Sequence, residues 1–165
     1  MTKVSFQIIP GGKITPEETA LFIALLIEQG KVAKPSAQRI KNCLKIVVCK
    51  VDGENAGIGA IKPKTPSDFG PDKANLQSLT NDIKWELGYI YVKESFRGLG
   101  LSSTIVRLLL KDFEGENLIA CTELNAANPM ITVLKKGGFY LMGNPWKSNR
   151  HDGYLGLFVK FEKGK

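Results

Sequence analysis

Hydrophobic and polar residues follow one another along the chain with the periods of strands and helices. Residues 4–8 alternate between apolar and polar side chains, which predicts a first strand. Thr15 and Pro16 begin a helix, because threonine is a good N-cap and proline suits the first helical position. The apolar pattern of this helix continues to Gln29, and Gly30 is suited to end it.

The rest of the pattern predicts a second short helix, a hairpin, four more strands and two more helices. Helices are expected over residues 36–44, 104–113 and 129–136, and strands over residues 45–51, 56–61, 85–92, 118–122, 139–142 and 154–161. Residues 63–82 are polar and rich in proline, aspartate and lysine, which predicts a long loop. This order of elements indicates one α/β domain over residues 1–165.

Composition narrows the class of protein. A chain of 165 residues that is 43% hydrophobic is long enough to bury one substantial core. The longest apolar run, residues 20–27, is too short to cross a bilayer, and residues 1–5 lack the layout of a signal peptide. Cys43, Cys49 and Cys121 lack the spacing of metal ligands. We therefore expect a cytoplasmic protein with no membrane segment and no metal.

The net charge of +7 favours anionic partners. The lysines are scattered, and no basic block is longer than Lys135-Lys136. This distribution favours a solvated surface and a field that attracts an anionic cofactor. It does not favour nucleic acid as a partner, although charge alone leaves that open.

One segment carries a specific chemical signal, a basic and glycine-rich turn between a predicted strand and a predicted helix. Its residues are Arg97, Gly98, Leu99, Gly100, Leu101, Ser102 and Ser103. Glycines let the backbone approach an anion, and the first N–H groups of a helix point toward such a ligand. The segment predicts a phosphate site, although the two glycines alone are also compatible with a simple tight turn. It matches neither a dinucleotide fingerprint nor a P-loop.

This turn resembles the Arg/Gln-x-x-Gly-x-Gly/Ala signature of the GCN5-related N-acetyltransferase (GNAT) superfamily. Ser102 stands where that signature has glycine or alanine. Asn128, followed by Gly138 and Phe139, resembles a second segment of the family, Asn-(x)n-Gly-Phe. The resemblance implies a mixed, mostly antiparallel sheet of six to seven strands flanked by about four helices. It also implies acetyl-CoA as a co-substrate.

The resemblance also implies roles for individual residues. The pyrophosphate of acetyl-CoA would lie on the turn from Arg97 to Ser103. The thioester arm would lie along the backbone at Tyr91 and Val92, and Asn128 would bind the cofactor in addition to capping a helix.

The reaction implied is transfer of an acetyl group to a primary amine of a small molecule, peptide or protein, by direct attack in a ternary complex. Such an amine must lose a proton, and Glu86 on the predicted strand 85–92 is our candidate base. Two alternatives remain: Glu86 is a solvated edge residue, or it anchors the substrate amine. Glu123 is the second candidate base, and His151 reads as an exposed loop residue.

Many members of the family carry a tyrosine, as general acid, at the position that Leu134 occupies here. Its absence supports one alternative, a catalytically idle acyl-CoA sensor or interaction domain. A second alternative, a toxin-like enzyme that acetylates aminoacyl-tRNA, is compatible with the basic charge, but the missing tyrosine argues against it. We expect the acceptor to be recognised by the first two helices and by residues 63–82 and 143–153. A homodimer is possible, since members of the family often dimerise, but no residue requires it.

Overall fold

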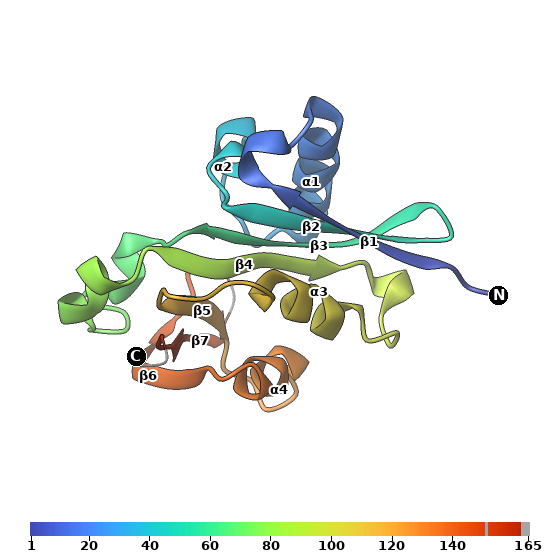
Figure 1. Ribbon diagram of the computed structural model, residues 1–165. Helices are drawn as coiled ribbons and strands as arrows, with labels where there is room; N and C mark the ends of the chain where they lie inside the picture. Colours follow the sequence, from blue (N-terminus) through green and yellow to red (C-terminus); the bar gives the residue numbers. More distant parts are fainter. Residues whose placement is uncertain (151, 163–165) are drawn as a thin grey trace. The chain divides into compact units, whose positions relative to one another are not determined.

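The computed structural model describes residues 1–150 and 152–162, so the prediction for His151 lies outside the described residues. The chain divides into two compact units. Unit 1 comprises Met1–Lys62 and Gly88–Asp112, and unit 2 comprises Pro63–Leu87 and Phe113–Lys165. One strand, β4 (Trp85–Val92), supplies residues to both units (Figure 1).

In the part of the chain that the structure describes, seven strands form a mixed sheet in the order β1-β2-β3-β4-β5-β7-β6. Besides β4, they are β1 (Val4–Pro10), β2 (Lys45–Val51), β3 (Glu54–Pro63), β5 (Leu118–Glu123), β6 (Tyr140–Lys147) and β7 (Tyr154–Lys160). The pairs β1–β2, β2–β3, β5–β7 and β6–β7 are antiparallel, whereas β4 and β5 are parallel. The expected sheet of six to seven strands is confirmed.

Within the described residues, four α-helices accompany the sheet: α1 (Pro16–Gln29), α2 (Ala37–Lys41), α3 (Leu101–Leu110) and α4 (Pro129–Lys136). The predicted start of α1 is confirmed, since the Thr15 side chain accepts the Glu18 N–H at 3.1 Å. The Glu18 carboxylate in turn accepts the Thr15 N–H at 2.9 Å. This reciprocal capping box satisfies donors that the helix itself leaves without partners.

Within unit 1, α1 and α2 cover one face of the strands and α3 covers the other (Figure 1). On the α1 face, the ring of Phe22 meets the ring of Tyr89 edge-on, with 6.0 Å between centroids. On the α3 face, β3 carries glycines where α3 packs against it. A Cβ atom at Gly59 would lie 2.5 Å from Ile105 of α3 and 2.8 Å from Ile90 of β4. Glycine therefore lets α3 approach the sheet closely.

Because of this close approach, we expect Gly59→Ala to lower the free energy of unfolding by about 1–3 kcal/mol, the usual cost of overpacking a core. Gly12→Ala is the matched control, since no atom lies within 4 Å of a Cβ placed there. Denaturant unfolding of both variants measures the difference. Equal stability of the two variants would contradict the packing described for β3 and α3.

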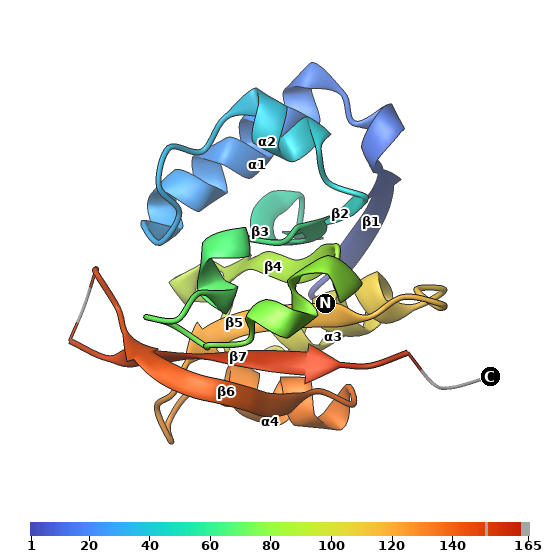
Figure 2. The ribbon, with the colours of Figure 1, turned by 90° about the vertical axis from the view of Figure 1, so that its left-hand side faces the viewer.

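In unit 2, residues 63–82 do not form the irregular loop that was predicted. They contain two 3₁₀ helices, η2 (Pro66–Phe69) and η3 (Gln77–Asp82). Phe69 is buried in one cluster with Trp146. Figure 2 shows this segment on one face of β5, β7 and β6, with α4 on the other. The segment is thus part of the core of unit 2.

Three elements differ most from their expected bounds. The strand predicted over residues 139–142 continues as β6 to Lys147, because Trp146 turns into the core after a shift in register. Helix α2 is shorter than residues 36–44, since Asn42 already caps its C-terminus. Helix α3 begins at Leu101, three residues before the predicted start.

Candidate functional site

The glycine-rich turn lies in unit 1, between the end of β4 and the start of α3. A single 3₁₀ turn, η4 (Glu94–Phe96), follows the strand. Arg97 closes this turn, because its N–H donates to the Glu94 carbonyl at 3.2 Å. Gly98 and Gly100 have φ angles of +87° and +72°, in the left-handed region that favours glycine.

The backbone of this turn presents an unbroken row of donors. Among the described residues, the N–H groups from Gly98 to Ser103 have no hydrogen-bond partner. Thr104 is the first residue of α3 whose N–H is satisfied, at 3.2 Å from the Gly100 carbonyl. Gly100 is the N-cap and has no side chain to accept a hydrogen bond. The protein thus leaves the N-terminus of α3 available to a ligand.

Charge at this N-terminus is positive. The first turn of α3 contains no acidic residue. Arg97 is exposed, and its Nε donates to the Val92 carbonyl at 3.4 Å. Within the described part of the chain, the other two guanidinium nitrogens of Arg97 have no partner. Together with the hydroxyls of Ser102 and Ser103 and the dipole of α3, these groups suit a phosphate or pyrophosphate.

The side chains at both ends of the turn hold it in place. Leu101 is buried, so it contributes only backbone to the donor row, whereas Leu99 is 54% exposed at the tip of the turn. Val92 is buried against β3, where its Cγ2 would lie 3.3 Å from a Cβ at Gly57. The turn is therefore anchored before and after the donors.

Tyr91 faces the opposite side of unit 1 from Val92. Its hydroxyl donates to Oε2 of Glu28, near the end of α1, at 2.9 Å. Burial, and then the Glu28 carboxylate, raise the pKa of Tyr91 above its ordinary value, so the phenol is neutral at physiological pH. Two residues earlier, Tyr89 has a φ of +57°, an unusual backbone conformation for an aromatic residue within a strand.

The other two predicted site residues, Glu86 and Asn128, belong to unit 2. Glu86 is buried in β4, and its Oε1 accepts the Thr65 N–H at 3.2 Å. It is therefore not the solvated edge residue that was the alternative. The structure places Glu86 opposite Ile119 in the parallel ladder of β4 and β5.

Asn128 is the N-cap of α4, as predicted. Its Oδ1 accepts the Met130 N–H at 3.0 Å. Its Nδ2 donates to the Thr122 hydroxyl at 3.0 Å and to the Glu123 carbonyl at 2.8 Å. Both amide hydrogens are thus used, and only the second lone pair of Oδ1 remains for a cofactor.

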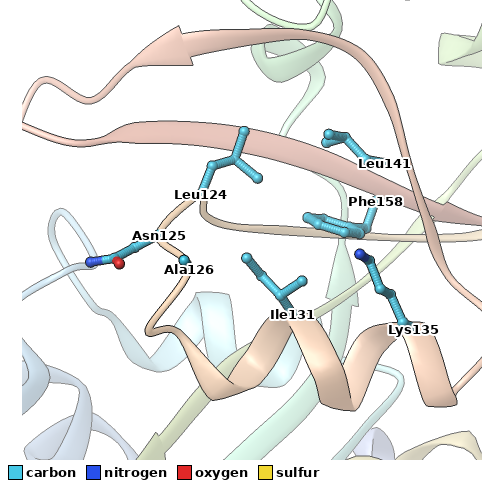
Figure 3. Close-up of a pocket in the computed structure, with 7 residues that line it drawn as sticks. All are labelled: Leu124, Asn125, Ala126, Ile131, Lys135, Leu141 and Phe158. Carbon is cyan, nitrogen blue, oxygen red and sulfur yellow. The ribbon is translucent and has the colours of Figure 1, made fainter.

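Unit 2 also contains an apolar pocket with a volume of about 330 Å³ (Figure 3). It is lined by Leu124, Asn125, Ala126, Ile131, Lys135, Leu141 and Phe158. The only charged group of this lining is the Lys135 ammonium, and the Lys135 side chain points toward Phe158 in Figure 3. None of the residues predicted for the site lines this pocket.

Several other groups offer little chemistry. Leu134 is buried, with 1% of its surface exposed. Burial raises the pKa of Cys43 to about 12, so its thiol is unreactive. Over the described residues, no three His, Cys, Asp or Glu side chains gather as a metal site requires. Nor does any helix in this part of the chain have the length and apolar character needed to span a bilayer.

Comparison with known proteins decides the family. A model of the acetyltransferase (GNAT) family matches residues 17–139. The chain belongs to the GNAT family. A search of curated proteins found no match to this GNAT-family chain.

Solved structures share its fold at low sequence identity. Escherichia coli ElaA is 11% identical with a TM-score of 0.65, and the alignment covers 96% of this chain and 99% of ElaA. An N-acetyltransferase from Staphylococcus aureus Mu50 is 15% identical with a TM-score of 0.66, covering 98% and 99%. Arabidopsis thaliana NAA60, solved with a bisubstrate analogue, is 16% identical with a TM-score of 0.63, covering 99% and 100%. These likenesses show the fold.

Two notable features of this GNAT-family chain were missed by sequence reasoning. Lys62 is 6% exposed, and its ammonium lies 5.3 Å from the centroid of the Tyr89 ring. Neither this buried lysine nor the left-handed φ of Tyr89 is marked by glycine, proline or a recurring spacing. No sequence signal pointed to the contact of Tyr91 with Glu28 either.

Proposed function

We propose that this protein transfers an acetyl group from acetyl-CoA to a primary amine. The observation that carries the proposal is the row of N–H groups from Gly98 to Ser103, which have no partner within the described residues. Six donors at a helix N-terminus beside Arg97 match a pyrophosphate in charge and in hydrogen bonding. Membership of the GNAT family supports acetyl-CoA as the molecule that supplies this pyrophosphate.

The neighbouring residues then have defined roles. Arg97 and the backbone from Gly98 to Ser103, with the side chains of Ser102 and Ser103, hold the pyrophosphate. Tyr91 and Val92 precede the turn along β4, and their backbone holds the thioester arm. The remaining lone pair of the Asn128 Oδ1 can accept one N–H of that arm.

The chemical step is attack of the amine nitrogen on the thioester carbonyl. A C–N bond forms, the C–S bond breaks, and coenzyme A leaves as a thiolate. Backbone donors near Tyr91 and Val92 stabilise the oxyanion that forms. Glu86 accepts the proton that the amine loses.

The leaving group needs little help from the protein. A thiol has a pKa of about 8.5, so its thiolate departs readily near neutral pH. The buried Leu134 in place of a tyrosine is therefore compatible with turnover. The missing tyrosine is also the only specific support for the alternative, a sensor that binds acyl-CoA without turnover.

Two measurements test the proposal together. Calorimetric titration with acetyl-CoA measures binding, and release of free thiol in the presence of a panel of amines, including aminoacyl-tRNA, measures transfer. We expect both binding and amine-dependent release. Binding without release by any amine would favour the sensor, and no binding by folded protein would overturn the proposal.

A further inference from the structure

The apolar pocket of unit 2 lies between α4 and the strands β6 and β7 (Figure 3). Phe158 of β7 is 1% exposed and lies at the base of the pocket. Gly156 precedes it by two residues, on the same face of β7. A Cβ atom at Gly156 would lie 2.7 Å from Leu141 and 2.9 Å from Leu124. Both leucines therefore reach across β7 where it has no side chain, and they form an apolar wall of the pocket.

Polar side chains are scarce in the lining of this pocket. Only Asn125 and Lys135 contribute them. The Asn125 Oδ1 already accepts the Ala127 N–H at 3.0 Å, and in Figure 3 the Asn125 amide points away from the other labelled side chains. The Lys135 side chain instead points from α4 toward Phe158. The Lys135 ammonium is thus the one polar group directed toward the pocket.

The surroundings of the pocket are positively charged. The stretch between Glu123 and Asp152 contains four lysine or arginine residues and no aspartate or glutamate. Glu123 does not line the pocket. Within the described residues, no carboxylate forms an ion pair with Lys135. Apolar walls with one unpaired cation suit a ligand that has an apolar body and a single negative charge.

A lysine in the last turn of α4 also has a structural explanation. Cations near a helix C-terminus interact favourably with the helix dipole, and both Lys135 and Lys136 lie in this last turn. The dipole accounts equally for both lysines. It does not account for the apolar pocket, which Lys135 lines and Lys136 does not. The two adjacent lysines therefore provide a matched pair for a test.

We propose that this pocket binds a small carboxylic acid with an apolar body, whose carboxylate pairs with the Lys135 ammonium. The volume of about 330 Å³ is near the lower end of the range for small-molecule sites, about 300–1,000 Å³. If each non-hydrogen atom takes about 30 Å³, as a water molecule does in the liquid, about eleven such atoms fit. Linear carboxylates of about eight or nine carbons have this size.

The charge of the pocket separates this ligand from an acyl chain that coenzyme A delivers. An acyl chain bound as a thioester has no negative charge to offer Lys135. The ligand is therefore the free acid. The inference does not depend on the proposed transfer reaction, because binding of the acid requires neither acetyl-CoA nor an amine.

The test titrates linear carboxylates, from butanoate to decanoate, into the protein without coenzyme A. The NMR signals of the backbone amides of Ile131 and Leu141 report binding. We expect saturable shifts, with a Kd that falls about fourfold for each added methylene until the pocket is full. The best carboxylate should bind about fivefold or more tightly than the alcohol of the same length, which lacks the charge.

Three variants assign the binding to this pocket. Lys135→Met keeps an apolar side chain of similar length without the charge, so it should bind the acid and the alcohol equally. Lys136→Met makes the same change outside the lining and should keep the preference for the acid. Ala126→Phe adds a ring at an exposed position of the lining, and it should weaken binding of both compounds about tenfold or more.

Several outcomes would overturn the proposal. They are the absence of saturable shifts with every carboxylate, equal affinity of the unaltered protein for acid and alcohol, and an unchanged preference in Lys135→Met. Shifts at Leu141 that follow protein concentration without ligand would mean that a second copy of the chain covers the pocket instead. Displacement of the carboxylate by coenzyme A would make the pocket part of the cofactor site. If no amine is acetylated but the carboxylate binds as expected, the transferase proposal fails and this site stands.

Discussion

The double variant Arg97→Ala/Ser102→Asp is expected to bind acetyl-CoA at least about 100-fold more weakly than the unaltered protein. Loss of Arg97 removes a charge-assisted hydrogen bond, which alone contributes about 1.5–3 kcal/mol. The carboxylate introduced in place of the Ser102 hydroxyl would repel the pyrophosphate and compete for the same N–H groups. Calorimetric titration of both proteins measures the change.

The double variant is expected to behave differently if the turn is a ligand site than if it is only a structural turn. An acidic residue in the first turn of a helix stabilises that helix, and α3 has none there. The variant should therefore melt no lower than the unaltered protein while it loses the cofactor. A simple tight turn, the alternative reading of the two glycines, predicts no effect on acetyl-CoA binding at all.

A matched control separates the effect of the substituted positions on affinity from the effect of the changed net charge. Ser95→Asp/Arg107→Ala makes the same change in formal charge at two exposed residues of unit 1 outside the donor row. We expect its affinity for acetyl-CoA to fall much less than that of the first double variant, because moderate salt partly screens exposed charges and neither side chain belongs to the donor row. If both double variants lose affinity equally, the general field attracts the cofactor and the turn is not its site.

The location of this turn could be predicted from the sequence, but its hydrogen bonding could not. Gly98 and Gly100 between an apolar strand and an amphipathic helix predict a tight turn, and in the structure both glycines have positive φ. The start of α3 was expected at Thr104, where the helix-like run of residues 104–113 begins. The structure instead uses Gly100, because its left-handed conformation already begins the helix at Leu101. That choice is what leaves the donors open.

Segments without a regular period were predicted least well. Apolar residues recur at regular spacing in the strands of unit 1, so these strands were expected within two residues of their observed bounds, whereas α2 and α3 were each misplaced by three residues at one end or at both. Residues 63–82 bury Phe69 and Ala74 among many polar residues, and no period reveals those contacts. Trp146 likewise joins a distant cluster, which extends β6 beyond the predicted strand. Tertiary packing determined these elements.

The contacts of Glu28 and Gln29 show the same limit within a helix that was predicted correctly. The capping box and Gly30 gave both ends of α1 from the sequence. Nothing in the sequence places its last turn beside Ile90 and Tyr91, which are about 60 residues away (61 for Gln29, 63 for Glu28). Local signals specify where a helix ends, while long-range pairing specifies what its last side chains meet.

The second large effect is expected for Glu86→Gln, which should lower kcat for acetyl transfer by about 10²- to 10⁴-fold, the usual contribution of a general base. Glutamine has nearly the same shape, and its Oε1 can still accept the Thr65 N–H that Glu86 accepts now. The fold and the affinity for acetyl-CoA should therefore remain unchanged, in contrast to the double variant of the pyrophosphate turn. Steady-state thiol release and calorimetry measure the two quantities separately.

Glu123→Gln is the matched control, because Glu123 is the other carboxylate that the sequence offers as a base. If Glu86 is the base, this variant keeps kcat within a few-fold of the unaltered protein. A large loss of kcat in Glu123→Gln, with kcat retained in Glu86→Gln, would instead make Glu123 the general base. The pH profile discriminates further. In Glu86→Gln the rate should rise with pH only as the acceptor amine itself deprotonates, near its pKa of about 10, since no side chain then removes its proton. A profile and a rate that match the unaltered protein would mean that the amine loses its proton to water, and that Glu86 serves only to hold Thr65 against β4.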